Sequence, residues 1–398
     1  MIERGATLIP AAERVVMPWR QSVKGGTIED RRLAEVTVSI PARISGVGLS
    51  VPPGVAAECD DAIRAIASLD ATHGPQLRPL ATMLLRAESI ASSKIEHEIA
   101  SVEDYVRALH GAKSNSSALS MVRATGALDR LVSGPLDLET LLDAHRRLMR
   151  DDPIDGPYAG RWRDMQNWIG GSDHSPRGAI YVPPPPDRVP GLMKDLIDFA
   201  TRDDIAVIPQ AAIAHAQLEA IHPFTDGNGR IGRALAAAVV RRRGIARSVT
   251  IPVASALAAR RSAYFQALND FHAGDTEPII SIIATASTVA AEESKVTASR
   301  LAELPSDWRE RVRPSRASAA ESLLDKLAEE PVVTTEDVED DLGLSVATTH
   351  RVIDRLRGAG IIRPLTNRTR NQVWGAGDIL DELADLDVRI AARVRAKE

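Results

Sequence analysis

Apolar residues recur every three or four positions along much of this chain, and this spacing constrains the fold more than any other feature of the sequence. Between Ala56 and His110 the recurring positions are Ile63, Ile66, Leu69, Leu80, Met83, Leu84, Ile90, Ile95 and Ile99. Such spacing places apolar side chains on one face of a helix. It predicts further helices over 118–132, 138–150, 191–201, 209–221, 230–243 and 258–273, and another within 276–303. We therefore expect a mainly α protein.

The charge and cysteine content exclude several classes of protein. There are 49 Lys and Arg against 54 Asp and Glu, a net charge of −5, so any contact with nucleic acid would need a local basic patch. The single cysteine, Cys59, rules out an intramolecular disulfide. No apolar run approaches the ~18 residues of a membrane span, and the first residues do not resemble a secretory signal. We expect a cytoplasmic protein with no membrane partner.

Shifts in composition divide the 398 residues into four parts. We predict an N-terminal helical region at 1–117, a central domain at 118–303, a linker at 304–318 and a C-terminal domain at 319–398. Within the central domain, 151–190 is rich in Gly, Pro and Asp, and long irregular segments of this kind are usually lids or binding loops. A short hairpin is predicted at about 171–182.

The segment 222–233 carries the chemistry. It joins the end of one predicted helix to the start of the next, near Arg230, through a loop with two glycines and an asparagine. Such a loop turns its N–H groups toward an anion, and the helix N-terminus adds partial positive charge. Arg230 and Arg233 lie on one helix face and can bind phosphate oxygens. Asp226 can hold a divalent cation and His222 can take a proton from a hydroxyl, so the segment predicts a phosphoryl- or nucleotidyl-transfer site.

The same residues contain the spacing GxGxxG at Gly227, Gly229 and Gly232, which is also found in dinucleotide-binding domains. That fingerprint requires a strand before the glycines and a βαβ unit around them. Here the preceding segment is helical, so we reject a dinucleotide site.

HPFTDGNGRIGR at 222–233 resembles the signature loop of the Fic family, HPFx(D/E)GNGRxxR, at every fixed position. The family's transferases attach AMP from ATP to a Ser, Thr or Tyr hydroxyl of a target protein. The resemblance implies that His222 is the base, that Asp226 holds Mg²⁺, and that Arg233 takes the γ-phosphate. It implies a nucleotide site made of Glu96, Asp226, Gly227, Asn228, Gly229, Arg230, Ile231, Gly232, Arg233 and Tyr264.

Residues 92–97, SSKIEH, resemble the inhibitory motif (S/T)xxxE(G/N) that precedes the core in one class of Fic proteins. The resemblance implies that Glu96 pairs with Arg233 and blocks productive placement of the γ-phosphate. His97 departs from the Gly or Asn found at the last position of the motif.

Two further segments are similar to parts of the family. The hairpin at 171–182 lies where the family has its flap, which holds the target segment by strand pairing. Tyr264 lies in a segment like the later helix whose tyrosine lies by the adenine, although Tyr264 could equally be a core aromatic residue. The fold that the resemblance implies for this chain is a mainly α, Fic-type helical bundle with a small β-hairpin flap.

The C-terminal region resembles a winged helix-turn-helix. Thr334 and Ser345 are good N-cap residues, and Gly343 separates the two helices that they begin. The basic residues of 345–370 are Arg351, Arg355, Arg357, Arg363, Arg368 and Arg370, against the one acid Asp354. This patch could bind DNA phosphates, or the domain could serve protein recognition or dimerisation.

Together these features predict Mg²⁺-dependent transfer of AMP from ATP to a protein hydroxyl, self-modification included, restrained by Glu96. One alternative is removal of AMP at the same site, with Glu96 positioning a water. The other is a DNA-binding regulator whose Fic core only senses nucleotide. The resemblance also suggests a homodimer.

Overall fold

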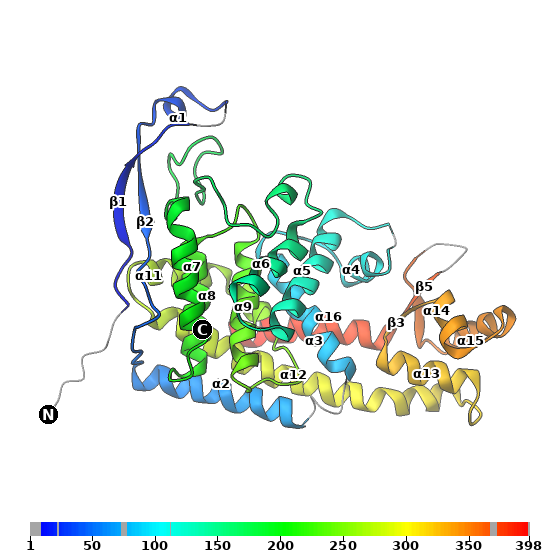
Figure 1. The fold of residues 1–398 in the computed structure, drawn as a ribbon. Helices are drawn as coiled ribbons and strands as arrows, with labels where there is room; N and C mark the ends of the chain where they lie inside the picture. Colours follow the sequence, from blue (N-terminus) through cyan, green and yellow to red (C-terminus); the bar gives the residue numbers. More distant parts are fainter. Residues whose placement is uncertain (1–8, 22–23, 73–77, 112, 367–371, 397–398) are drawn as a thin grey trace. The chain divides into compact units, whose positions relative to one another are not determined.

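The computed structural model describes residues 9–21, 24–72, 78–111, 113–366 and 372–396, and these residues are mainly helical, as predicted (Figure 1). They form two compact units, each built from three separate stretches of chain. The first unit contains 1–63, 126–244 and 260–285, and the second contains 64–125, 245–259 and 286–398. No described helix is long and apolar enough to cross a membrane.

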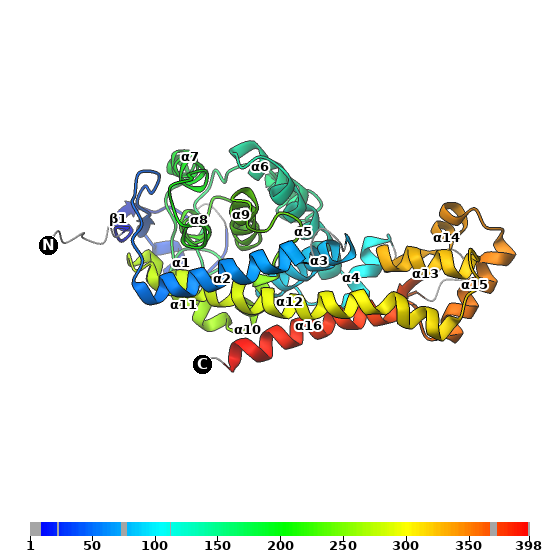
Figure 2. The ribbon, with the colours of Figure 1, turned by 90° about the horizontal axis from the view of Figure 1, so that it is seen from below.

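The first unit is built around one buried helix. Its helices are α1 (Ile28–Arg32), most of α2 (Pro53–Thr72), the end of α5 (Ser116–Ser133), α6 (Leu138–Met149), α7 (Val189–Ala200), α8 (Val207–Ile221), α9 (Asn228–Arg242), α11 (Arg261–His272) and the start of α12 (Glu277–Val312). Every residue of α8 except Glu219 is buried, because this helix is apolar all round and packs against α7, α9 and α11 (Figure 2). This central helix leads directly into the loop at 222–227.

A two-stranded hairpin lies at the edge of this unit. Strand β1 (Glu13–Pro18) pairs antiparallel with β2 (Glu35–Ile40). The hairpin predicted at 171–182 reduces to one bridge, between Ile169 and Tyr181, so the flap segment has almost no regular strand. The N–H of Ser39 donates to the Val182 carbonyl at 2.8 Å and ties β2 to the flap.

The second unit joins part of the N-terminal region to the C-terminus. It contains α3 (Arg78–Ile95), α4 (Val102–Leu109), α10 (Val253–Ala259), α13 (Ala319–Glu329), α14 (Thr335–Leu342), α15 (Val346–Gly358) and α16 (Gly377–Arg395). A single apolar cluster holds Ile90, Tyr105, Val106 and Met121 against Val332, Leu365, Val373 and Leu380. Helix α3 therefore shares a core with the C-terminal sheet and with α16.

The C-terminal elements follow the predicted order. Ser345 caps α15 and Thr334 caps α14 in a capping box with Asp337. Gly343 ends α14 with a φ of 60°, which a residue without a Cβ adopts easily. Strands β3 (Val332–Thr334), β4 (Ile362–Pro364) and β5 (Val373–Ala376) form a sheet in the order β3-β5-β4.

The predicted linker at 304–318 is shorter than expected. Helix α12 continues through Val312, so only 313–318 separates it from α13. Trp308 explains the continuation, because its side chain is fully buried and its Nε1–H donates to Asp378 Oδ2 at 2.7 Å. The stretch 304–312 is therefore a packed helix and not a linker.

Candidate active site

The loop between α8 and α9 is held in a sharp turn. His222 ends α8 in the left-handed region with a φ of 48°, and Gly227 precedes α9 with a φ of 81°. Helix α9 begins at Asn228, two residues before the predicted start. The Asn228 side chain accepts from the Phe224 N–H at 2.9 Å and donates to the Phe224 carbonyl at 3.0 Å. The Asn228 side chain therefore closes the loop. The N–H groups in the first turn of α9 have no acceptor within the helix, as at any helix start.

His145, from α6, supports the loop from below. Its Nδ1 accepts from the Gly160 N–H at 2.9 Å, so its Nε2 carries the proton and donates to the Asp226 carbonyl at 3.1 Å. The ring stacks on Phe224 with centroids 3.7 Å apart. Burial lowers the pKa of His145 to about 4, which keeps the ring neutral and this tautomer intact. These contacts give His145 a structural role in holding the loop.

Arg163 supports the other end of the loop. This side chain is buried, its Nε donates to the His222 carbonyl at 2.8 Å, and its N–H donates to the Pro223 carbonyl at 2.9 Å. Burial lowers the pKa of the guanidinium to about 10, so it stays charged at neutral pH. No sequence motif marks Arg163, which lies in the irregular segment 151–190, far from the loop in sequence.

His222 lies beside a carboxylate. Its Nδ1 is 3.9 Å from Glu219 Oε2, one helical turn earlier, and both side chains are mostly buried. A carboxylate near Nδ1 favours a proton on that nitrogen and leaves Nε2 as the base. Glu219 is thus a candidate orienting group that the sequence analysis missed, although its position three residues before His222 on a helix could have indicated it.

Asp226 and Arg230 form a pair at the mouth of the loop. Arg230 Nη2 donates to Asp226 Oδ2 at 2.9 Å, and the aspartate side chain is 54% exposed while the arginine is buried. An exposed carboxylate on a phosphate-binding loop is a hard oxygen donor of the kind that Mg²⁺ uses, with water and phosphate oxygens as its remaining ligands. No group of three or more His, Cys, Asp or Glu side chains in the described ranges could hold a metal alone.

Arg233 is buried one turn further along α9 and contacts Tyr264. Arg233 Nη1 donates to Tyr264 Oη at 3.3 Å, and the same hydroxyl lies 2.8 Å from His215 Nε2. Tyr264 is fully buried, as expected of a core aromatic residue, and its place beside the adenine stays a prediction. Burial lowers the pKa of His215 to about 3, so this ring is neutral. The three side chains form a continuous polar chain between α8, α9 and α11.

Two of the predicted nucleotide-binding residues, Ile231 and Gly232, have packing roles in the structure. The Ile231 side chain is fully buried. A Cβ on Gly232 would lie 2.8 Å from His215 Nδ1, so this glycine permits the close approach of α8 and α9. The backbones of Gly227, Asn228 and Gly229 are candidates for phosphate contact at this turn, and a contact of Ile231 or Gly232 with the nucleotide stays a prediction.

Glu96 lies in the second unit, in the turn that follows α3. The helix ends at Ile95, and His97 takes a φ of 65° while its N–H donates to the Lys94 carbonyl at 3.1 Å. This left-handed position is one that Gly or Asn adopts with little strain. The geometry explains why the inhibitory motif favours Gly or Asn there. The pairing of Glu96 with Arg233 stays a prediction.

Comparison with known proteins agrees with the geometry of the loop. The sequence model of the Fic/DOC family matches residues 135–240, which include α6, the flap segment and the whole loop. This part of the chain is therefore similar to the Fic domain. The matched residues lie within the central domain predicted at 118–303, whose bounds stay a prediction.

Proteins of known name resemble the Fic domain and its surroundings. Protein adenylyltransferase fic-1 of Caenorhabditis elegans is 32% identical over 153 residues, which cover 37% of this chain and 27% of the relative. Protein adenylyltransferase Fic of Nematostella vectensis is 33% identical over 156 residues, 38% of this chain and 32% of the relative. The chain thus spans about a third or less of the length of these relatives.

A solved structure extends the likeness in fold. The crystal structure of a Fic family protein from Desulfovibrio desulfuricans superimposes with a TM-score of 0.53 at 22% identity. The match covers 82% of this chain and 97% of that one. The arrangement of helices around the Fic domain is therefore shared beyond residues 135–240.

Proposed function

We propose that this protein transfers AMP from ATP to a Ser, Thr or Tyr hydroxyl of a protein, itself included. The observation that carries the proposal is the turn at 222–228, which joins His222, mostly buried beside Glu219, to the N-terminus of α9. A base and an anion site on one short loop fit nucleotidyl transfer. The adenylyltransferase names of the relatives support the same reaction.

In the proposed reaction each residue of the loop has one role. His222 takes the proton of the acceptor hydroxyl while the hydroxyl oxygen forms a bond to the α-phosphorus of ATP. The bond from that phosphorus to the bridging oxygen of pyrophosphate breaks, and pyrophosphate leaves. The N–H groups at the start of α9 and the Arg230 guanidinium stabilise the charge on the phosphates. Asp226 would hold Mg²⁺, which supplies charge neutralisation when bound.

We further propose that Glu96 restrains this activity by pairing with Arg233. The turn at 95–97 supports the proposal, since the left-handed His97 ends α3 at the position where the inhibitory motif has Gly or Asn. If Glu96 instead positions a water, the protein removes AMP from a modified target. Release of AMP that is lost in Glu96→Gly would favour this second reaction.

One labelling experiment tests the transfer, the base and the restraint together. Purified protein is incubated with Mg²⁺ and α-labelled ATP, and label on protein is measured on a denaturing gel. We expect more label in Glu96→Gly than in wild type, and none in Glu96→Gly/His222→Ala. Glu98→Gly is the matched control, because it removes a neighbouring carboxylate and leaves Glu96 in place. Equal label in the Glu96→Gly and Glu98→Gly proteins would refute the restraint, and label that survives His222→Ala would refute the base.

We propose that the C-terminal elements form a winged helix that binds protein and not DNA. Helix α14 contains five acidic residues and no basic one, and this charge repels phosphate. Two arginines of the predicted basic patch already have partners: Arg355 donates to the Val312 and Arg313 carbonyls, and Arg363 pairs with Glu103. Arg368 and Arg370 lie outside the described residues. Tight, salt-dependent binding to a labelled DNA duplex would contradict the proposal.

A further inference from the structure

The turn that carries Glu96 joins α3 to α4, and it belongs to the second unit together with β3, β4, β5 and α16. Local hydrogen bonds hold its backbone: the N–H groups of Glu96 and Glu98 both donate to the Ser93 carbonyl, at 3.0 and 3.1 Å. Ser101 then begins α4 in a capping box with Asp104. A short turn held in this way follows the helices on either side of it, so the contacts that fix α3 and α4 also place Glu96.

The end of α3 is attached to α16. Lys94 Nζ, in the last turn of α3, donates to Asp387 Oδ2 at 2.8 Å, only two residues before Glu96. Both side chains of this ion pair are partly exposed, which limits its strength. Further from the turn, Ile90 of α3 and Leu380 of α16 share one buried apolar cluster. The apolar contact stabilises the junction of the two helices, and the ion pair is the part of it that lies next to Glu96 in the chain.

Helix α4, on the other side of the turn, is attached to β4 and the residue after it. Arg363 of β4 pairs with Glu103, the second residue of α4, at 2.8 Å. Arg107 Nη1 donates to the Leu365 carbonyl at 3.3 Å. Tyr105 is fully buried and belongs to the same apolar cluster as Leu365. The turn is therefore tied to C-terminal elements on both of its sides, through α16 before Glu96 and through β4 after it.

We propose that the C-terminal elements from β3 to α16 set the strength of the restraint that Glu96 places on AMP transfer. Through the contacts at Lys94 and Arg363 they hold the turn at 95–101, and a weaker contact lets Glu96 leave its restraining position. A contact made in only one of two positions shifts the balance between them by its own free energy. The proposal rests on the proposed restraint by Glu96 and on the proposed AMP transfer.

Charge reversal on α16 tests the contact at the end of α3. Asp387→Lys faces Lys94 with a like charge, whereas Asp385→Lys makes the same change at an exposed side chain whose charge acts on Arg300 of α12. We expect Asp387→Lys to raise the label on protein about two- to fivefold, and Asp385→Lys to change it less than about 1.5-fold. The charge swap Lys94→Asp/Asp387→Lys restores an ion pair and should give less label than Asp387→Lys alone.

A Glu96→Gly background separates this control from a general loss of stability. If the C-terminal elements act through Glu96, Asp387→Lys changes the label less than about 1.5-fold once Glu96 is absent. A substitution that acted by weakening the whole protein would change the label in both backgrounds. Arg363→Glu, which repels Glu103 on the other side of the turn, should show the same dependence on Glu96.

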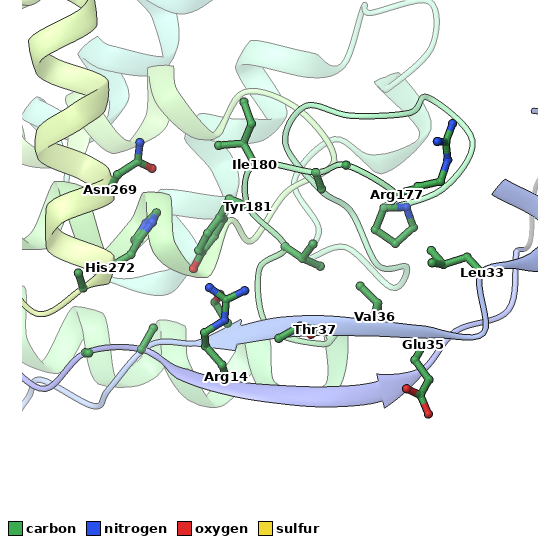
Figure 3. A pocket seen from close by; sticks show the side chains of 18 residues that line it. Arg14, Leu33, Glu35, Val36, Thr37, Arg177, Ile180, Tyr181, Asn269 and His272 are labelled. Carbon is green, nitrogen blue, oxygen red and sulfur yellow. The ribbon is translucent and has the colours of Figure 1, made fainter. Parts of the chain in front are cut away.

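These variants leave the side chains of the first unit unchanged. The loop at 222–227 belongs to that unit, and so do all the residues that line the groove of about 820 Å³ between β2 and the flap segment 176–182 (Figure 3). A change in label that depends on Glu96 is therefore not caused by a direct alteration of the loop or of this groove.

Hydrogen exchange at the turn gives a readout that needs no nucleotide. The amides of Glu96, His97 and Glu98 are donors in the turn, and they exchange faster when the turn opens more often. Mass spectrometry of peptides that span 92–101 should show exchange about two- to fivefold faster in Asp387→Lys than in wild type or Asp385→Lys. Peptides from α8, in the first unit, should exchange equally in all three proteins.

Failure of this proposal differs from failure of AMP transfer. Absence of label even in Glu96→Gly would refute the transfer, and exchange at 92–101 would then decide by itself whether the C-terminal elements hold the turn. Unchanged exchange in both Asp387→Lys and Arg363→Glu refutes the proposal, as does an equal rise in label with and without Glu96. If Asp387→Lys unfolds at a lower temperature than Asp385→Lys, the charge swap decides: label and exchange that stay at the level of Asp387→Lys would refute the proposal.

Discussion

Removal of the Tyr264 hydroxyl should weaken both the fold and the nucleotide site. In Tyr264→Phe, Arg233 Nη1 loses the acceptor at 3.3 Å and His215 Nε2 loses its partner at 2.8 Å. All three side chains are buried, so water does not replace the hydroxyl easily. Hydrogen bonds to charged groups contribute ~1.5–3 kcal/mol, and an unsatisfied buried group costs ~1–3 kcal/mol. We expect the free energy of unfolding to fall by about 2–3 kcal/mol.

The same change should raise the KM for ATP more than it lowers kcat. Arg233 would no longer be held by Tyr264, so a γ-phosphate would have to order its side chain on binding. The KM is measured by label transfer in a Glu96→Gly background, and stability is measured by urea unfolding.

Tyr105→Phe is the matched control for this variant. Tyr105 is also fully buried, but its hydroxyl contacts Thr125 Oγ1 at 3.0 Å in the second unit. It should lose comparable stability and leave the KM unchanged. Equal KM values in Tyr264→Phe and in the Tyr264 parent protein would refute the positioning of Arg233, and a rise in KM for Tyr105→Phe would show that lost stability alone explains the effect.

Further predictions concern buried groups. Asp195 accepts a hydrogen bond from the Ile44 N–H at 2.6 Å, and Asp70 accepts one from the Ser248 N–H at 2.6 Å. Asp195→Ala and Asp70→Ala should therefore each lower the free energy of unfolding by ~2 kcal/mol or more, as measured by urea titration. Losses below about 0.5 kcal/mol would contradict this. In the folded protein the pKa of His215 is about 3 and that of His145 is about 4, both below the ordinary histidine value. As the pH falls below about 6.5, these two rings therefore take up protons in the unfolded protein before they do so in the folded protein. Stability should then drop by up to ~1.4 kcal/mol per pH unit for each ring and level off near pH 3–4; a flat profile from pH 7 to 4.5 would refute it. Burial raises the pKa of Cys59 to about 11, so its thiol should react with iodoacetamide at pH 8 only after unfolding, as followed by mass spectrometry.

The sequence predicted those parts of the site that are local in the chain. The apolar run before residue 222 predicts a buried helix, and the glycines predict the turn, because both depend on neighbouring residues. His145 and Arg163 could not be predicted in the same way. They reach the loop from 81 and 59 residues away, and their contacts are mainly with backbone carbonyls, which carry no side-chain signature. Tyr264 was ambiguous for a related reason, since only its partners on α8 and α9 show that its hydroxyl is used inside the core.

The C-terminal region shows the same limit. Caps at Thr334 and Ser345 are short-range features, and the structure has them as predicted. The extension of α12 through the expected linker depends on Trp308, whose partner Asp378 lies 70 residues later. Counting arginines gave a basic patch, but pairing with distant acids such as Glu103 removes part of that charge from the surface available to DNA. A count of basic residues therefore overestimates the positive charge of a surface wherever those residues form ion pairs with distant acidic residues.

The two units separate the chemistry from its proposed restraint. His145 and Arg163, which contact the loop, belong to the first unit, as does the loop itself. Helix α3 belongs to the second unit, where Lys94 Nζ pairs with Asp387 of α16 at 2.8 Å. Substitutions at sites without shared partners usually have additive effects. Changes in α16 should therefore act on α3 and leave the contacts of His145 and Arg163 with the loop unchanged.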